Sequence, residues 1–200
     1  MAEQVQITLF TFDELSEESQ QKLIEGFRQD YDPDYSHIYY DFINDMSEQY
    51  GADISVDDIQ WSGFWSQGDG ACFTCDFDEE VIFPILKEGL HEEDVASLEG
   101  FELSQAKSVR CGPSNYYSHE HTVTGDIWLD RPSDDAELSG NIHQHLEDAL
   151  TAIIRDSCQD LYQKLEEEYN RATSDESIIE EIKNIWPGCN FRKDGTIFAR

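Results

Sequence analysis

The strongest strand signal in the chain lies between residues 58 and 77, where two aromatic-rich runs flank a polar turn at residues 67–70. The positions that share one face before and after this turn are Ile59, Trp61, Gly63 and Trp65, then Ala71, Phe73, Cys75 and Phe77. Alternation bounded by Gly and Asp is typical of a β-hairpin. Because Phe64 has the opposite parity, we expect the hairpin to bury a second aromatic cluster or to present an exposed patch.

Four further stretches have strand-like patterns. Val5, Ile7 and Leu9 alternate with polar residues within a first predicted strand at residues 4–12. A strand is expected at residues 101–110 and another at 116–129, where His119 and His121 share a parity. A small hairpin is expected at residues 190–200.

Apolar residues at spacings of three and four predict the helices. The first two are expected from Ser16, a plausible cap, to about residue 29, and from 35 to 50. Around Pro84 we expect either a short helix that starts near the proline or an irregular segment. A long helix is predicted over residues 135–171, with Gly140 marking its true start or a kink, and a shorter one follows Ser174.

The order of these elements favours an α+β fold over a parallel α/β fold. We expect an antiparallel sheet with a central aromatic hairpin, packed by N-terminal helices and by a long C-terminal helix. Residues 1–200 are expected to form a single domain, with a helical C-terminal subdomain at 134–200 as the alternative. Since no apolar run approaches 18 residues and residues 1–4 lack a signal-peptide pattern, a cytoplasmic protein without membrane contact is expected.

The net charge is the feature of the sequence that says most about function. The chain holds 44 acidic and 13 basic residues, giving a formal net charge of −31. Between Arg28 and Lys87 there are fourteen carboxylates and no lysine or arginine. Such charge opposes folding by self-repulsion, so it indicates either a strongly basic partner or a salt-rich habitat. Direct nucleic-acid binding is disfavoured, because phosphates require Lys and Arg.

Cysteine and histidine are the residue types that could carry metal chemistry. Cys72, Cys75 and Cys111, with His119 and His121, have zinc-ligand chemistry, but a second close ligand pair is absent. A hydrolase could use one of these histidines with Ser118 or Cys111, yet the chain has no Gly-x-Ser-x-Gly, phosphate-loop or His-Glu-x-x-His motif. We therefore expect no catalytic residue, no metal and no cofactor, and whether these five residues bind an ion stays open.

Three stretches of the chain resemble a known protein family. The sequence Phe-Asp-Glu-Leu-Ser-Glu-Glu at residues 12–18, the motif Ser-Gly-Phe-Trp-Ser-Gln-Gly-Asp-Gly-Ala at 62–71, and Glu-Tyr at 168–169 with Thr-Ser-Asp-Glu at 173–176 resemble a family of small phage and prophage proteins. Some members of that family are labelled antitoxins of toxin–antitoxin systems. The resemblance implies a phage-borne accessory protein and assigns no catalytic residue. Small residues usually stand in the family where Cys72 and Cys75 stand here.

Charge and resemblance together predict a non-enzymatic inhibitor that mimics nucleic acid and binds a basic host or defence protein, such as a restriction or CRISPR-like enzyme. Its oligomeric state stays open. The alternatives are an antitoxin-like protein and a metal-dependent enzyme. The expected partner-binding residues are Asp30, Asp32, Asp34, Asp41, Asp45, Glu48, Asp57, Asp58, Asp76, Asp78, Glu79 and Glu80. The motif residues are Trp61, Phe64, Trp65, Gly68, Asp69 and Gly70.

Overall fold

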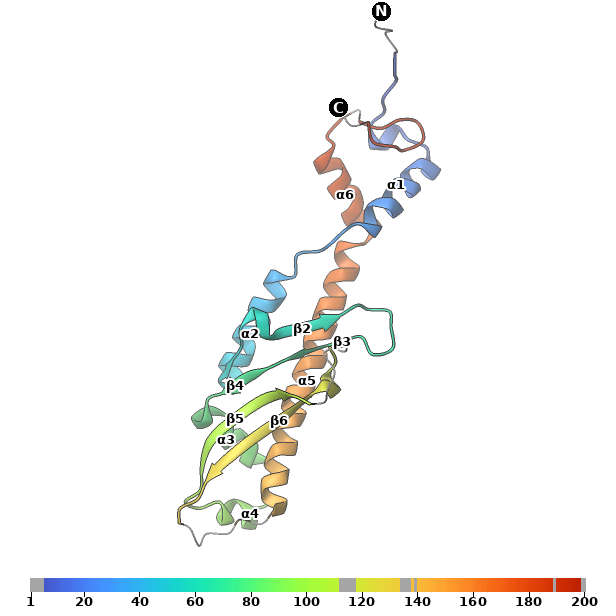
Figure 1. The fold of residues 1–200 in the computed structure, drawn as a ribbon. Coiled ribbons are helices and arrows are strands. Elements are labelled where there is room, and N and C mark those ends of the chain that lie inside the picture. Colours follow the sequence, from blue (N-terminus) through green and yellow to red (C-terminus); the bar gives the residue numbers. More distant parts are fainter. Residues whose placement is uncertain (1–5, 112–117, 134–137, 139, 189, 199–200) are drawn as a thin grey trace, which may run out of the picture. The chain divides into compact units, whose positions relative to one another are not determined.

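The structure, a computed structural model, describes residues 6–111, 118–133, 138, 140–188 and 190–198. These residues form two compact units (Figure 1). The central unit spans residues 35–166, and the terminal unit combines the described parts of 1–34 and 167–200. The boundary falls inside one helix, between Glu166 and Glu167. The single-domain organisation, and the alternative subdomain at 134–200, stay predictions.

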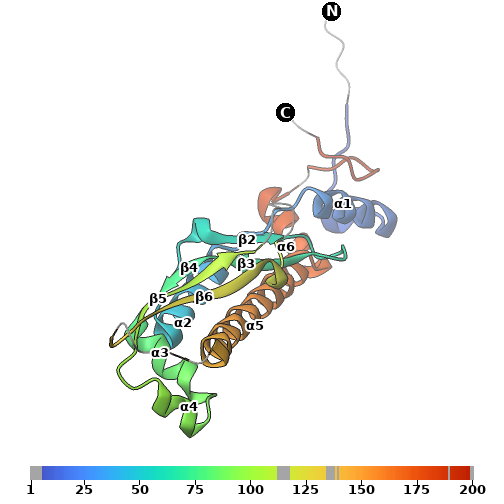
Figure 2. The same cartoon turned by 60° about the horizontal axis from the view of Figure 1, so that its bottom comes forward.

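The central unit is built on a four-stranded antiparallel sheet with the order β1-β4-β5-β6. Its strands are β1 (Ala52–Asp53), β4 (Cys75–Phe77), β5 (Glu102–Arg110) and β6 (Val123–Asp130). Helices α2 (Ser36–Tyr50) and α5 (Gly140–Ala172) lie on one face of this sheet (Figure 2). The predicted α+β class, the antiparallel sheet and the long C-terminal helix are confirmed.

The core of the central unit depends on one stripe of α5. Leu146, Leu150, Ile154, Cys158, Leu161 and Leu165 recur at spacings of three or four and are all 0% exposed. The helix approaches β6 closely at Gly125, where a Cβ atom would lie 2.7 Å from Cγ of Leu150. The backbone N–H of Gly125 also donates to Oγ1 of Thr151 over 2.9 Å. Glycine at this position therefore allows the sheet and α5 to pack directly.

The aromatic hairpin is present, but its strands are shorter than predicted. Strand β2 (Ile59–Ser62) pairs with β3 (Gly70–Phe73), and Trp61 lies opposite Ala71. The prediction that the first strand reaches Trp65 is wrong, because Asp69 holds residues 63–69 as a loop. Its Oδ2 accepts hydrogen bonds from the backbone N–H groups of Trp65 (2.9 Å) and Ser66 (2.6 Å).

The second half of the hairpin also differs from the prediction. Residues 71–77 do not form one strand, because the chain leaves β3 at Thr74 and joins the other sheet as β4. All four residues of β3 are buried. The hydroxyl of Ser108 in β5, itself buried, donates to the carbonyl oxygen of Phe73 over 2.8 Å and links the two sheets.

The aromatic residues of the hairpin gather on the core side of the central unit. Trp61 stacks on Phe64 with ring centroids 5.1 Å apart, and Tyr35 and Tyr162 complete the cluster. The prediction that Trp61 and Phe64 point to opposite faces of one strand is wrong. The strand ends at Ser62, so the alternation of side chains does not extend to Phe64. Trp65 is the exposed member, at 77%.

Capping residues set where several helices begin. Ser16 accepts a hydrogen bond from the backbone N–H of Ser19 ahead of α1 (Glu17–Gln29), as predicted. Ser174 accepts a hydrogen bond from the backbone N–H of Ser177 and caps α6 (Asp175–Ile185) in the same way. Asp78 caps α3 (Glu79–Glu88), so both alternatives expected around Pro84 are wrong: the segment is a helix that starts at Glu79 and contains the proline. A shorter helix, α4 (Glu92–Ser97), follows.

The terminal unit has a separate small core. Its buried members are Phe12, Leu15, Ile24, Ile178, Ile182 and Phe191. The predicted strand at residues 4–12 is wrong over its described part, where only Phe10 forms a bridge, with Phe191. The segment after Phe191 turns back near residue 195, and Phe191 also bridges Ile197, in agreement with the small hairpin predicted for this part of the chain.

We predict that Gly125→Val destabilises the protein by about 1–3 kcal/mol, because overpacking forces α5 away from β6. Urea unfolding followed by circular dichroism measures the change. Gly89→Ala is the control, since its Cβ would meet nothing within 4 Å. Equal stability of the two variants would contradict the close packing of α5 on the sheet.

Candidate functional site

Carboxylates from two neighbouring helices meet on one surface of the central unit. We define the α2–α5 acidic face by Asp41, Asp45 and Glu48 of α2 with Asp156 and Asp160 of α5, all exposed. The helix repeat places Asp41, Asp45 and Glu48 in one row, since residues three and four apart are neighbours on a helix surface. Asp156 and Asp160 form a second such row. Asp45, Asp156 and Asp160 line a shallow groove of about 220 Å³ between the helices.

Lys164 shows how close the two rows come. Its Nζ lies 2.8 Å from Oδ2 of Asp160 and 3.6 Å from Oδ2 of Asp45. The hydrogen bond to Asp160, together with the charges of Asp160 and Asp45, raises the pKa of Lys164 against the effect of burial. One lysine thus partly neutralises a face that carries five carboxylates.

The remaining predicted binding carboxylates are not on this face. Asp30, Asp32 and Asp34 belong to the terminal unit, whereas Asp57, Asp58, Asp76, Asp78, Glu79 and Glu80 lie elsewhere in the central unit. Of the twelve predicted residues, the structure places three, those of α2, on the α2–α5 acidic face. Asp156 and Asp160 were missed, although they stand four residues apart in the long predicted helix.

Several of those carboxylates have local structural contacts. Asp78 Oδ1 accepts hydrogen bonds from the backbone N–H groups of Glu80 and Val81 at the start of α3. Asp58 Oδ2 accepts from the backbone N–H of Ser55 over 3.2 Å. Asp76 forms a 3.0 Å ion pair with Lys107. Asp78 and Asp58 thus stabilise the starts of helical turns, where negative charge is favourable, and Asp76 pairs with a lysine of the neighbouring strand β5.

The motif glycines shape the hairpin and its contact with a neighbouring turn. Gly68 has a φ of 111°, in the region that favours glycine. Gly70 lies directly against His119, whose Cα would be 3.0 Å from a Cβ at that position. The hairpin therefore packs on the segment that carries the two histidines.

His119 and His121 do not lie on a strand face as predicted. His119 directly precedes a short 3-10 helix (Glu120–Thr122), and His121 lies within it. Strand β6 begins only at Val123. One ligand atom from each of His119, Glu120 and His121 lies within 4.8 Å of the others, and no cysteine belongs to this group of described residues. Glu120 already contacts His119 Nδ1 at 2.7 Å and accepts a 3.3 Å hydrogen bond from Gln159. Protein atoms thus satisfy Glu120 without an ion, and the absence of metal stays a prediction.

The described cysteines divide by exposure. Cys72, Cys75 and Cys158 are buried, and Cys111 is exposed. Burial raises the pKa of Cys72, raises that of Cys75 to about 12, and raises that of Cys158 further from its ordinary value. Such thiols remain protonated and inert near neutral pH. Cys189 lies outside the described residues.

The terminal unit holds a larger concavity that the sequence analysis missed. A groove of about 640 Å³ lies between α1, α6 and the turn near residue 195. Its aromatic walls include Phe27 and Trp186. The apolar stripes of the two helices were visible in the sequence, but nothing in the sequence indicated that they would face each other.

The geometry defines an α+β protein in which two neighbouring helices share an acidic face. Residues 35–175 match a domain of unknown function (DUF8835), and the chain belongs to that family. No curated protein and no solved structure matches the chain. The matched region contains the whole central unit, whereas the groove of the terminal unit lies outside it. Among the described helices, none is long and apolar enough to cross a membrane.

We predict that Cys111 is the fast-reacting thiol when Cys189 is replaced by serine. With a thiol reagent at about pH 8, the other three cysteines should react only on unfolding, since burial raises their pKa values. Mass spectrometry of timed samples measures the labelling. Rapid modification of Cys72 or Cys75 in the folded protein would contradict their placement in the core.

We also predict that Asp69→Ala loosens the hairpin loop, because two backbone N–H groups lose their acceptor. The expected cost is about 1 kcal/mol, with faster hydrogen exchange at Trp65 and Ser66. Gln67→Ala, an exposed change in the same loop, is the control. Unchanged exchange in the Asp69 variant would show that the loop does not depend on this carboxylate.

Proposed function

We propose that this protein is a non-enzymatic inhibitor that binds a basic, nucleic-acid-binding protein through the α2–α5 acidic face, in place of DNA or RNA. The observation that carries the proposal is the adjacency of two carboxylate rows, bridged at Asp45 and Asp160 by Lys164. Residues at i and i+4 on a helix have Cβ atoms about 5–6 Å apart, and packed helices lie about 8–10 Å apart. Such rows resemble the spacing of neighbouring phosphates along a nucleic-acid strand.

Charge explains why a carboxylate surface can substitute for a phosphate backbone. Lysine and arginine contacts to phosphate position a nucleic acid without reading its sequence, so a folded surface with similarly spaced charges can make the same contacts. The side chains of Asp45 and Asp160 remain 56% and 59% exposed, although both lie within ion-pair distance of Lys164. They are therefore accessible to a partner's cations.

The resemblance to phage and prophage proteins supports a particular class of partner. The proposed targets are host enzymes that handle nucleic acid in defence, such as restriction or CRISPR-like nucleases, in the cytoplasm of the host. A small basic toxin bound by the same face would make the protein an antitoxin, and the experiment below separates these two outcomes.

We predict that Asp41→Asn/Asp45→Asn/Glu48→Gln weakens partner binding by about tenfold or more, since each exposed charge contributes up to about 1 kcal/mol. Proteins captured from host lysate at about 0.05 M NaCl should be released at about 0.5 M NaCl, because salt screens surface charges. Added duplex DNA or RNA should also release a true target of mimicry.

The matched control is Glu92→Gln/Glu93→Gln/Asp94→Asn, which removes the same charge from the first turn of α4. It should retain the partner. The proposal would be overturned if the partner stays bound at high salt or if nucleic acid fails to displace it. Equal loss of partner binding in the α2 variant and the α4 control would also overturn it. Release by salt but not by nucleic acid would favour the antitoxin. A protein that binds nothing and needs molar salt to fold would point to a salt-rich habitat.

A further inference from the structure

The groove of the terminal unit combines an apolar floor with an acidic rim. Leu23 and Phe27 of α1 face Ile185 and Trp186 at the end of α6, and Ile197 closes one side. Ile185 and Ile197 are 48% and 38% exposed, which is high for large aliphatic side chains in a folded unit. The volume of about 640 Å³ falls in the range of about 300–1,000 Å³ that is usual for binding pockets.

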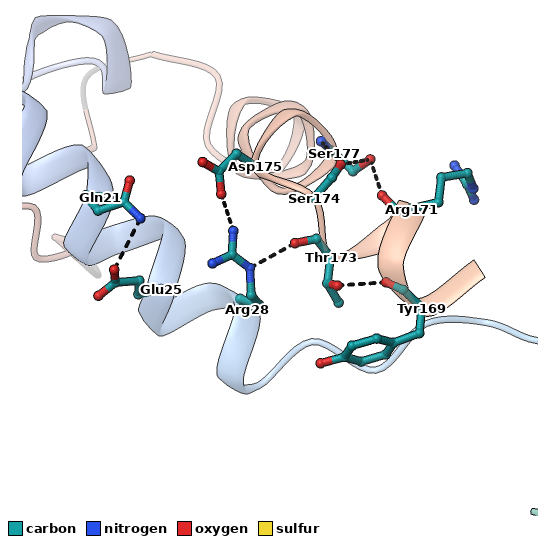
Figure 3. A network of polar contacts seen from close by, with 9 residues as sticks. All are labelled: Gln21, Glu25, Arg28, Tyr169, Arg171, Thr173, Ser174, Asp175 and Ser177. Carbon is teal, nitrogen blue, oxygen red and sulfur yellow. Dashed lines mark hydrogen bonds and ion pairs between the residues drawn. The ribbon is translucent and has the colours of Figure 1, made fainter. Parts of the chain in front are cut away.

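Polar contacts hold the two helical walls together. The Nε of Arg28 donates to the carbonyl oxygen of Thr173 over 2.8 Å, and its guanidinium pairs with Asp175 (Figure 3). Phe27 and Trp186 meet edge to face with ring centroids 5.7 Å apart. The groove is therefore formed before any partner arrives.

The third wall is fixed by the turn near residue 195. Gly195 has a φ of 82°, and a Cβ there would lie 2.7 Å from the carbonyl oxygen of Ser19. The hydroxyl of Ser19 donates to the carbonyl oxygen of Lys193 over 2.9 Å. The turn thus packs tightly against α1 and keeps Thr196 and Ile197 at the groove.

The rim carries four carboxylates, Asp30, Asp32, Glu181 and Asp194, against one lysine, Lys22. Hydrogen bonds from the side chain and backbone of Thr196 lower the pKa of Asp194. An occupant must therefore present apolar side chains to the floor and positive charge to the rim. A second copy of the chain and an anionic membrane both carry the wrong charge for this rim.

We propose that this groove binds a cationic amphipathic helix of a partner protein. The apolar face of that helix would contact Phe27, Trp186 and Ile185, and its lysine or arginine side chains would pair with the rim. Helices bound in grooves commonly use apolar anchors at three- and four-residue spacing. The site is separate from the α2–α5 acidic face, since every residue that lines it belongs to the terminal unit.

Gly26 offers a way to fill the groove without disturbing the fold. It lies in α1, lines the groove, and its Cβ would meet nothing within 4 Å. Glycine inside a helix is less stable than most residues by about 0.5–1 kcal/mol. Gly26→Leu should therefore leave the protein at least as stable while its side chain occupies the groove.

The probe is a synthetic Leu/Lys peptide of about 18 residues, enough for about five helical turns, with its leucines on one helical face. Calorimetric titration of the full chain should show saturable binding, and circular dichroism of the mixture should show induced peptide helicity. Gly26→Leu should weaken this binding by about tenfold or more. Gly89→Leu, also open at its Cβ but in the central unit, should leave it unchanged.

Two further peptides separate the groove from general charge attraction. A peptide of the same composition, scrambled so that leucine lies on all sides, should bind at least about tenfold more weakly. A Leu/Glu peptide should not bind, because the rim repels it. Equal binding of the scrambled peptide, binding of the Leu/Glu peptide, or an unchanged Gly26→Leu variant would each overturn the proposal.

If the peptide does not bind the groove, the proposed function is unaffected, because the α2 variants test the α2–α5 acidic face. Self-association at high salt that Gly26→Leu abolishes would assign the groove to a second copy of the chain, and would also overturn the partner-helix proposal. Analytical ultracentrifugation at about 0.5 M NaCl, where repulsion between copies is screened, provides that measurement.

Discussion

The packing of α5 against the sheet is the interaction on which the central unit depends. Each fully buried leucine or isoleucine of its stripe contributes about 1.5–3 kcal/mol relative to an exposed side chain. These contributions oppose the self-repulsion of a chain with a net charge of −31. The same helix brings Asp156 and Asp160 beside α2, so the apolar stripe on one side positions the carboxylates on the other.

The acidic residues divide into those with a local structural role and those free to meet a partner. Asp78 and the glutamates that follow it stand at the start of a helix, where backbone N–H groups and the helix dipole favour negative charge. The carboxylates of α2 lack such a position: no acidic residue stands in its first turn. Asp45 pairs with Lys164, and the row as a whole lies exposed beside the carboxylates of α5, which is why it carries the functional proposal.

Local signals predicted much of the fold. Ser16 and Ser174 marked helix limits correctly, because caps act on the adjacent backbone alone. The strand ending at Ser62 was not predictable, since it depends on a side chain, Asp69, seven residues later. The turn at His119 likewise lies against Gly70, far away in the sequence.

The candidate surfaces were harder to predict than the elements that form them. Asp41, Asp45 and Glu48 were among the predicted binding residues, but their alignment with Asp160 depends on how α2 and α5 pack. The groove was missed because its walls come from opposite ends of the chain: Phe27 and Trp186 meet only after folding. Neither tertiary arrangement leaves a periodic signal in one stretch of sequence.

The division of the chain inside α5 has a consequence for synthesis on the ribosome. The terminal unit needs residues before 35 and residues after 166, whereas the central unit is complete once residue 166 has been made. Domains generally fold as units while translation proceeds from the N-terminus. Helix α1 must therefore wait, without its partner, until the residues of the terminal unit after 166 emerge. A premature stop near residue 170 would release the acidic face on a folded body with no groove.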